Sequence, residues 1–335
     1  MMTKIAINGF GRIGRPALKV ILDKHPNLEV VAVNDLTDTK TLSHLLQYDS
    51  NYGKYEKEVT FDEEHIIVDE KRIKVFAQRD PELLPWKELG VEVVLECTGF
   101  FTDETGAGKH LKAGAKKVVI SAPCKGGNIK TLILGVNEFD YDSSKDDIVS
   151  NGSCTTNCLA PVVRVLNDNL GIEKGLMTTI HSYTNDQKIL DLPHKDLRRA
   201  RAAAVSMIPT TTGAATAVAE AIPELKDKLN GMAMRVPTST VSIVDFTVVV
   251  KRETTVEEVN ALFQKASDED TLGVLNATNE PLVSVDYKGN PFSSIVDLPL
   301  TKVDGNLVKV LAWYDNEFGY TNRFVEMAEF VGKGL

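Results

Sequence analysis

Hydrophobic and polar residues along the first half of the chain form a pattern that predicts strands and helices in turn. Short apolar runs, typical of buried strands, are separated by segments whose apolar residues recur every three or four positions, typical of amphipathic helices. Such an alternation predicts a doubly wound parallel sheet covered by helices, the α/β class. The predicted strands are residues 4–8, 30–33, 92–96, 117–120, 131–134 and 147–150, with short alternating strands inside 59–76 and helices at 12–24, 39–46 and 102–113.

The second half of the chain has longer strand-like runs with fewer helices between them. This pattern predicts an α+β domain with a mostly antiparallel sheet. The predicted strands are 176–180, 241–251, 282–285, 294–298 and 307–314, and the predicted helices begin at Ser153, Ala214, Thr255 and Thr321. We therefore expect a first domain over residues 1–150, a second over 151–316, and a C-terminal helix over 317–335 that returns to the first domain.

Composition and charge narrow the class of protein. The 335 residues are 43% hydrophobic and 25% charged, the proportions of a soluble globular protein. The formal net charge is −9 and there is no block of basic residues, which argues against nucleic acid or an anionic membrane as the main partner. Residues 1–7 enter a strand without a secretory pattern, so we expect a cytoplasmic location. Four cysteines (Cys97, Cys124, Cys154 and Cys158) are too few for a disulfide framework.

A glycine-rich turn follows the first predicted strand. Gly9, Gly11 and Gly14 form G-x-G-x-x-G at the start of a predicted helix, and Asp35 follows Gly14 by 21 residues at the end of the next strand. Such glycines let backbone N–H groups approach a pyrophosphate at a helix N-terminus. A carboxylate after the second strand accepts hydrogen bonds from ribose hydroxyls and disfavours a 2′-phosphate. A glycine-rich turn of another α/β protein is the alternative, but the combined context favours a Rossmann domain that binds NAD.

Other polar residues lie where a ligand of such a sheet is expected. Thr98 and Ser121 follow predicted strands, and ligands bind beyond the carboxyl ends of strands in open α/β sheets. Arg79 lies in a polar loop. It either covers an adenine ring or carries a solvated charge, and the sequence leaves both open.

Cys154 is the candidate nucleophile of the second half. Ser153 is a plausible N-cap, which puts Cys154 in the first turn of a helix. The helix dipole and free N–H groups there favour an anion and predict a lowered thiol pKa. Free cysteines are also common as small buried hydrophobic residues, and this stretch alone does not decide between the two.

His181 and several arginines supply further candidate chemistry. His181 ends a predicted strand, where it is either a structural residue or the base that takes the thiol proton. The segment with Arg198, Arg199 and Arg201 is either a solvated loop or an anion pocket, because guanidinium groups bind phosphate through paired hydrogen bonds. Thr212-Gly213 opens an alanine-rich helix and Arg235 adjoins a strand, so both add possible anion contacts. We find no cluster of metal ligands.

These segments together resemble the phosphorylating, NAD-dependent, bacterial-type glyceraldehyde-3-phosphate dehydrogenases. The resemblance extends over essentially the whole chain. It is carried by Asn8-Gly-Phe-Gly-Arg-Ile-Gly-Arg15, Ser153-Cys-Thr-Thr-Asn-Cys158, His181-Ser-Tyr-Thr184, Met234-Arg-Val-Pro-Thr238 and Trp313-Tyr-Asp-Asn-Glu317. The cysteine segment is the most specific of them.

The resemblance implies a role for each matching residue. It makes Cys154 the nucleophile and His181 its activator. The positions that match the family's NAD site are Arg12, Ile13, Asp35, Arg79, Ser121 and Asn316, and Leu36 and Pro193 match the NAD-specific members. The positions that match the site for the substrate's phosphate are Thr184, Arg199 and Arg235, and those that match the inorganic phosphate site are Ser153, Thr155, Thr212 and Gly213.

The activity that the resemblance implies is oxidation of D-glyceraldehyde 3-phosphate with NAD and inorganic phosphate. The product is 1,3-bisphosphoglycerate, formed through a cysteine thioester by a homotetramer. Erythrose-4-phosphate dehydrogenase is the nearest alternative, and a semialdehyde dehydrogenase is a more distant one. A non-enzymatic role, as an NAD-binding regulator or a surface-adhering protein, is an alternative of another class.

Overall fold

The chain forms two compact units. The computed structural model describes residues 2–124 and 126–334. One unit comprises Met1–Leu132, Phe139–Gly152 and Thr321–Leu335, and the other comprises Ile133–Glu138 and Ser153–Tyr320. Among the described residues, no helix has the length and apolar character needed to cross a bilayer.

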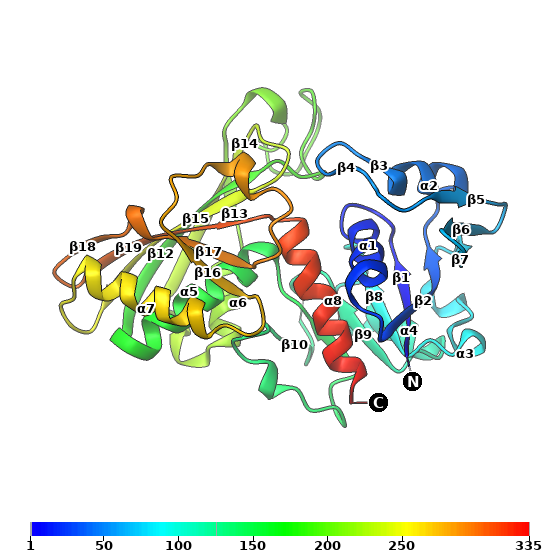
Figure 1. Ribbon diagram of the computed structural model, residues 1–335, viewed down its shortest axis with the longest axis horizontal. Coiled ribbons are helices and arrows are strands. Elements are labelled where there is room, and N and C mark those ends of the chain that lie inside the picture. Colours follow the sequence, from blue (N-terminus) through cyan, green and yellow to red (C-terminus); the bar gives the residue numbers. More distant parts are fainter. Residues whose placement is uncertain (1, 125, 335) are drawn as a thin grey trace. The chain divides into compact units, whose positions relative to one another are not determined.

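The first unit is built on a nine-stranded sheet (Figure 1). Its strand order is β10-β11-β9-β8-β1-β2-β7-β6-β5. The strands from β10 to β7 pair in parallel. The short strands expected inside 59–76 are β5, β6 and β7, and they pair antiparallel at one edge of the sheet. The bounds are β1 Thr3–Asn8, β2 Leu28–Asn34, β5 Val59–Phe61, β6 His65–Val68, β7 Lys71–Phe76, β8 Val93–Glu96, β9 Lys117–Ile120, β10 Lys130–Thr131 and β11 Ile148–Ser150. The doubly wound parallel sheet is thus confirmed, although the strand expected at 131–134 is only Lys130–Thr131.

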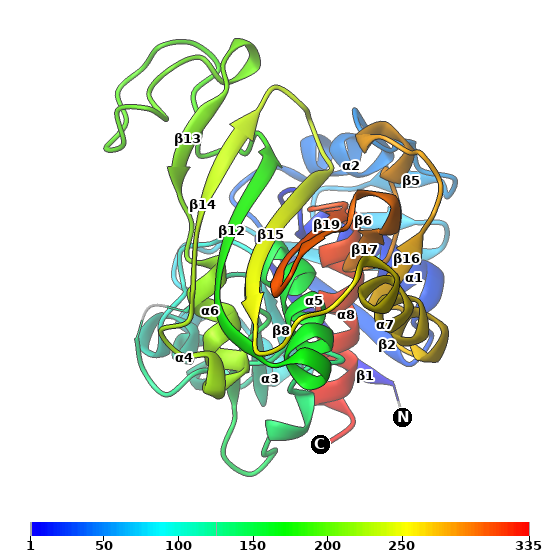
Figure 2. The same cartoon turned by 90° about the vertical axis from the view of Figure 1, so that its left-hand side faces the viewer.

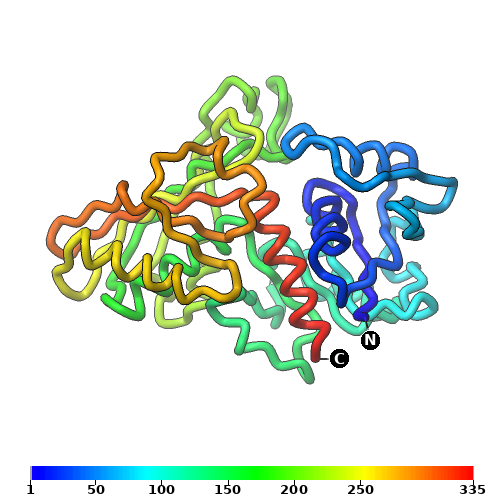
Figure 3. Tube along the Cα trace, in the orientation of Figure 1, coloured from blue at the N-terminus to red at the C-terminus, as the bar shows by residue number. Residues whose placement is uncertain are grey.

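The helices of the first unit cover the sheet with apolar faces. The helices and the small ribbon are α1 Gly14–Lys24, α2 Thr39–Gln47, α3 Trp86–Leu89, α4 Glu104–Lys112, β3 Tyr48–Asp49 and β4 Gly53–Lys54. The C-terminal helix α8 (Phe318–Gly332) runs beside α1 (Figures 1 and 3). A bond of 2.7 Å between His25 Nδ1 and Glu329 Oε2 joins the end of α1 to α8.

The second unit contains an eight-stranded, mostly antiparallel sheet (Figure 2). Its order is β13-β14-β12-β15-β19-β17-β16, with β18 beside β19, and only β12/β14 and β16/β17 pair in parallel among the described strands. The bounds are β12 Ile172–Ser182, β13 Ile208–Thr211, β14 Leu229–Val236, β15 Ser242–Val250, β16 Leu275–Thr278, β17 Ser294–Asp297, β18 Lys302–Asp304 and β19 Leu307–Tyr314. Helices α5 Cys154–Leu170, α6 Ala214–Ala221 and α7 Val256–Glu269 pack with these strands in one apolar core.

One predicted strand of the second unit is wrong. Residues 282–285 do not pair in a sheet, and Ser284–Tyr287 forms a 3₁₀ turn instead. The alternating apolar residues Val283 and Val285 are both more than half exposed, so this alternation has no buried face to pack against the core.

Candidate active site

Cys154 and His181 meet in the second unit. Cys154 is the first residue of α5, and His181 lies near the end of β12. Cys154 Sγ is 3.4 Å from His181 Nε2, and His181 Nδ1 is 2.7 Å from the carbonyl oxygen of Ser182. Arg235 Nη1, which only donates, also lies 2.5 Å from Nδ1. In the tautomer that carries its proton on Nδ1 and donates it to the Ser182 carbonyl, the lone pair of Nε2 faces the sulfur. The imidazole is therefore oriented to take the thiol proton.

The electrostatics of this pair differ from the expectation. Burial raises the pKa of the Cys154 thiol, although the charge of Arg235 and hydrogen bonding by Thr155 act in the opposite direction. The prediction of a lowered thiol pKa is therefore wrong for this arrangement, because desolvation outweighs the helix start and the nearby cation. Burial, followed by the charge of Arg235, lowers the pKa of His181 to about 3. The pair is held as a thiol beside a neutral imidazole, and the thiolate arises by proton transfer within the pair.

A buried tyrosine supports both residues. Tyr314 Oη lies 2.9 Å from Thr155 Oγ1 and 2.8 Å from Thr179 Oγ1. Its ring meets the His181 ring edge to face, with centroids 6.0 Å apart. Tyr314 was not singled out from the sequence, although it lies inside the Trp313–Glu317 segment. Ser153 fulfils its predicted N-cap role, because its Oγ accepts a hydrogen bond of 3.0 Å from Thr156 N.

Arg235 lies directly beside the imidazole. Its strand β14 pairs in parallel with β12, and Arg235 is the register partner of His181. Arg235 Nη1 donates to the Ser182 carbonyl oxygen at 3.2 Å, while Arg235 Nε is buried without a hydrogen-bond partner in the described residues. A buried guanidinium nitrogen without an acceptor is unfavourable, so this position suits an anionic ligand.

Arg199 and Thr184 converge on a carboxylate that the sequence interpretation missed. Asp186 accepts hydrogen bonds from Arg199 Nη1 and from Thr184 Oγ1. Arg199 Nε also donates to Thr210 Oγ1 at 2.9 Å. The two other arginines of the segment do not join this group, because Arg198 is exposed and Arg201 pairs with Asp191.

Thr212 and Gly213, the remaining residues predicted to contact an anion, lie at the start of a helix. Thr212 and Gly213 precede α6, and Gly213 is its N-cap residue. Thr212 Oγ1 accepts a hydrogen bond of 3.2 Å from Ala214 N. Helix α6 packs in the same apolar core as α5, the helix that carries Cys154.

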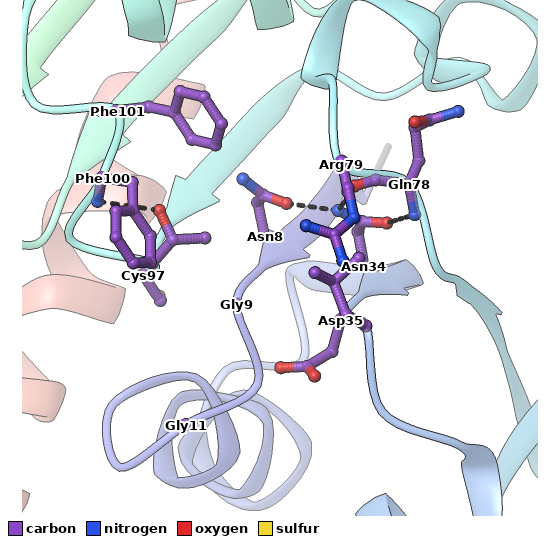
Figure 4. Close-up of a pocket in the computed structure, with 12 residues that line it drawn as sticks. Asn8, Gly9, Gly11, Asn34, Asp35, Gln78, Arg79, Cys97, Phe100 and Phe101 are labelled. Carbon is purple, nitrogen blue, oxygen red and sulfur yellow. Dashed lines mark hydrogen bonds between the residues drawn. The ribbon is translucent and has the colours of Figure 1, made fainter.

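A cavity of about 630 Å³ lies at the carboxyl ends of the parallel strands of the first unit (Figure 4). It includes Gly9, Gly11, Asp35 and Arg79 of the predicted set, together with Thr98. Its full lining is Asn8, Gly9, Gly11, Asn34, Asp35, Leu36, Gln78, Arg79, Cys97, Thr98, Phe100 and Phe101. Asn34, Gln78 and the two phenylalanines were missed, although Asn34 and Asn8 end strands and so carried a usable signal.

The glycine loop is shaped for close approach by a ligand. Gly9 has φ +91°, and a Cβ there would lie 2.8 Å from Thr98 N. A Cβ on Gly14 would lie 2.1 Å from the carbonyl oxygen of Gly9, whereas one on Gly11 would meet no protein atom within 4 Å. Asp35 Oδ2 accepts a hydrogen bond of 2.9 Å from Phe10 N, which ties the loop to the second strand. The backbone at Gly11 is thus open to the cavity, and these residues fit a dinucleotide.

Several residues predicted for the cofactor lie outside the lining of this cavity. Ile13 is the N-cap of α1, and the Arg12 guanidinium makes two bonds of 2.5 and 3.2 Å to Asp49. Ser121 follows β9. Asn316 belongs to the second unit, where its Oδ1 accepts hydrogen bonds from the hydroxyls of Ser182 and Ser242.

Cys97 lines the cavity of the first unit. Burial and Glu96 raise the pKa of the Cys97 thiol, which argues against a second reactive thiolate at the cavity. Among residues 2–124 and 126–334, no group of three or more His, Cys, Asp or Glu side chains is arranged to hold a metal ion.

Comparison with known proteins points to one family along the whole chain. Residues 3–104 match the family model for the glyceraldehyde 3-phosphate dehydrogenase NAD binding domain, and residues 153–316 match that for the C-terminal domain. The chain is 57% identical to glyceraldehyde-3-phosphate dehydrogenase 1 of Bacillus subtilis, over 99% of both chains. It is 58% identical to glyceraldehyde-3-phosphate dehydrogenase 1 of Bacillus cereus and 57% identical to glyceraldehyde-3-phosphate dehydrogenase of Geobacillus stearothermophilus, in both cases over 100% of each chain.

Proposed function

This chain belongs to the glyceraldehyde-3-phosphate dehydrogenase family, and from that premise we propose that it oxidises D-glyceraldehyde 3-phosphate with NAD and inorganic phosphate. The product is 1,3-bisphosphoglycerate, formed through a thioester on Cys154. The observation that carries the mechanism is the 3.4 Å approach of His181 Nε2 to Cys154 Sγ, with Nδ1 held by the Ser182 carbonyl.

The first half of the reaction forms a bond from sulfur to carbon. Cys154 Sγ attacks the aldehyde carbon as its proton moves to His181 Nε2, which then protonates the carbonyl oxygen to give a hemithioacetal. His181 next takes the hydroxyl proton back as the C–H bond breaks. Bound NAD supplies the acceptor for that hydride. The remaining carbonyl is a thioester on Cys154, and His181 holds the released proton until it leaves the site.

The second half transfers the acyl group to phosphate. An oxygen of inorganic phosphate attacks the thioester carbon, the C–S bond breaks, and the acyl phosphate is released. The departing sulfur is stabilised by Arg235, whose charge lowers the pKa of the thiol. Thr155, at the start of α5, also stabilises the departing sulfur, because its hydrogen bonding lowers the pKa of the Cys154 thiol.

Two anion sites are required, and the second unit has residues for both. We assign the substrate's own phosphate to Thr184, Arg199 and Arg235, because Arg235 has a buried nitrogen without a partner and Asp186 holds Thr184 and Arg199 together. We assign inorganic phosphate to Ser153, Thr155, Thr212 and Gly213, at the starts of two helices.

The NAD site is assigned to residues of the glycine loop, the cavity and one residue of the second unit. The assigned residues are Gly9, Gly11, Arg12, Ile13, Gly14, Asp35, Arg79, Ser121 and Asn316. The cavity at the strand ends supports Gly9, Gly11, Asp35 and Arg79 directly. In this assignment residues 1–150 bind NAD, residues 151–316 carry the chemistry, and residues 317–335 return to the first domain.

We also propose a homotetramer in the cytoplasm. The segment 183–207 exposes a run of large apolar side chains that suit burial against another copy of the chain. These are Ile189, Leu190, Leu192, Leu197, Val205 and Met207, each more than half exposed. None of the four cysteines, which all lie in the described part of the chain, forms a disulfide, and this suits a reducing compartment.

The experiment that tests the function is an NADH absorbance assay with glyceraldehyde 3-phosphate and NAD, with and without inorganic phosphate. We expect turnover that requires phosphate and is abolished by alkylation of Cys154. Erythrose 4-phosphate serves as the competing substrate. Phosphate-independent oxidation that favours the four-carbon sugar would contradict the proposal. Analytical ultracentrifugation tests the tetramer, and a monomer at micromolar concentration would rule that part out.

A further inference from the structure

The cavity of the first unit rests on a buried hydrogen-bond network that converges on Glu96. Glu96 is the last residue of β8, is completely buried, and does not line the cavity. Its carboxylate accepts from Asn8 Nδ2 at 2.6 Å, from His110 Nε2 at 3.1 Å and from Thr98 N at 2.7 Å. The hydroxyl of Thr98 donates to it as well.

One branch of the network is anchored by main-chain atoms. Asn34 Oδ1 accepts from Gln78 N at 2.8 Å, and Asn34 Nδ2 donates to Gln78 O at 2.9 Å. Because backbone N–H and C=O groups cannot exchange roles, the orientation of the Asn34 amide is determined. Its Nδ2 also donates to Asn8 Oδ1 at 2.7 Å, so Asn8 must present Nδ2 to Glu96.

The other branch is anchored by an indole. Trp86 Nε1 lies 3.0 Å from His110 Nδ1, and both side chains are fully buried. An indole N–H only donates, so Nδ1 accepts and the proton of the neutral imidazole is on Nε2. His110 therefore donates to Glu96, and it cannot reverse this bond without losing the bond from Trp86.

Glu96 consequently has donors on every side. Only an ionised carboxylate accepts from all four of them. A carboxylic acid or an amide at this position would point its own O–H or N–H group at one of these donors, and that hydrogen bond would be lost. The same carboxylate bonds to Asn8 and to Thr98. Gln78 and Phe100 lie on opposite sides of the cavity (Figure 4). Asn8 and Asn34 extend from Glu96 to Gln78 beside Arg79, while Thr98 Oγ1 accepts from Phe100 N at 3.1 Å on the opposite wall.

We propose that Glu96 is a positioning residue for the dinucleotide, which it holds in place by joining the Gln78–Arg79 wall to the Thr98–Phe101 wall. It makes no contact with the ligand itself. This inference rests on the proposed function only for the identity of the ligand, NAD. Loss of the carboxylate therefore weakens NAD binding while the chemistry at Cys154 is unchanged.

The direct test is Glu96→Gln, which keeps the shape of the side chain and replaces one acceptor oxygen with a donor amide. Binding of NAD to the full-length protein is measured by calorimetric titration without substrate, and steady-state kinetics are measured separately. We expect the dissociation constant and the KM for NAD to rise about tenfold or more, because each carboxylate oxygen accepts two buried hydrogen bonds that an amide nitrogen cannot accept. The kcat at saturating NAD stays within about twofold, because the change acts on binding alone.

A second substitution, Trp86→Phe, should partly restore the NAD affinity of Glu96→Gln, a result that a merely structural role of Glu96 would not produce. Trp86→Phe removes the indole donor, so His110 can carry its proton on Nδ1 and accept from the new amide through Nε2. The double variant Trp86→Phe/Glu96→Gln is therefore expected to bind NAD several-fold more tightly than Glu96→Gln, although it has lost core volume. Ile66→Val, a buried change on β6 outside the network, is the control and should leave NAD affinity unchanged.

Three results would overturn the inference: native affinity in Glu96→Gln, an equal loss in Ile66→Val, or a loss confined to kcat. If Glu96→Gln does not fold, His110→Leu removes one donor to Glu96 and should raise the dissociation constant in the same direction. The binding measurement separates this inference from the proposed function. Native protein that binds NAD but does not oxidise glyceraldehyde 3-phosphate would contradict the function, and the variants would still decide the role of Glu96. Native protein that does not bind NAD would contradict both.

Discussion

Arg235 Nη1 lies 2.5 Å from His181 Nδ1, and both atoms face the carbonyl oxygen of Ser182. The two residues are register partners on the parallel strands β14 and β12. The Ser182 carbonyl oxygen is an acceptor within reach of both nitrogen atoms. The positive charge of Arg235 also opposes a second proton on the ring, which adds to the effect of burial on the pKa of His181. The arginine therefore favours the neutral form of the imidazole.

Replacement of Arg235 by leucine should affect both substrate binding and the imidazole. We expect kcat/KM for glyceraldehyde 3-phosphate to fall by about 100-fold or more, the usual effect of losing a charged contact in an active site. The pKa of His181 should rise from about 3, because a neighbouring positive charge has been removed. Steady-state kinetics and an NMR titration of the ring measure the two effects. Arg252→Leu removes an exposed arginine that pairs with Glu258 and should leave both unchanged. An unaltered KM in Arg235→Leu would refute its assignment to the substrate's phosphate.

The buried neutral His181 should make the protein sensitive to acid. Its pKa falls from the ordinary 6.5 to about 3 in the folded chain. As pH decreases below about 6.5, the unfolded chain gains a proton that the folded chain does not bind until about pH 3, so the free energy of unfolding decreases. Within this window the slope from His181 approaches about 1.4 kcal/mol per pH unit. Urea unfolding at a series of pH values measures it. His181→Gln should flatten the curve, and parallel curves for the two proteins would contradict the prediction.

Two glycines of the first turn should respond differently to alanine. In Gly9→Ala the new Cβ meets Thr98 N at 2.8 Å and the backbone has φ +91°, so we expect a loss of stability of about 1–3 kcal/mol together with weaker NAD binding. In Gly11→Ala the Cβ meets no protein atom within 4 Å, so stability should change by less than about 0.5 kcal/mol. Because Gly11 lines the cavity, its NAD affinity should still fall. Thermal unfolding and NAD titration separate the two variants, and native affinity in Gly11→Ala would show that this face does not meet the cofactor.

The two cysteines of α5 should have unequal importance. Cys154→Ser removes the sulfur beside His181, and we expect kcat to fall by at least about 10³-fold with NAD binding retained. Cys158→Ser is the matched control. Cys158 is fully buried, and burial raises its pKa far above the ordinary range, so it has no thiolate to offer. It should lose some stability but keep its kcat. Comparable losses of activity in both variants would contradict the assignment of Cys154 as the nucleophile.

Local structure was accessible from the sequence by itself. The turn at Gly9, Gly11 and Gly14, the N-cap at Ser153, and the strands that end at Asn8 and Glu96 depend on backbone conformation and on neighbours within a few positions. These features also carried the family resemblance, and with it the expected NAD site and the identity of Cys154 and His181. The change of pattern between the two halves was enough to predict a parallel sheet followed by a mostly antiparallel one.

The tertiary structure decided which of these groups meet and how they are charged. Asp186 joins Thr184 to Arg199, and Tyr314 bonds to Thr155 from 159 positions away. Glu96 accepts hydrogen bonds from a neighbouring strand, a helix and the loop that follows its own strand. Burial raises the pKa of Cys154, whereas the sequence predicted a lowered pKa. Val283 and Val285 are exposed, and the strand predicted there does not form. Each of these outcomes depends on desolvation and on contacts between residues far apart in the chain. A periodic pattern records the tendency of a segment to be buried, but it does not record what that segment is buried against.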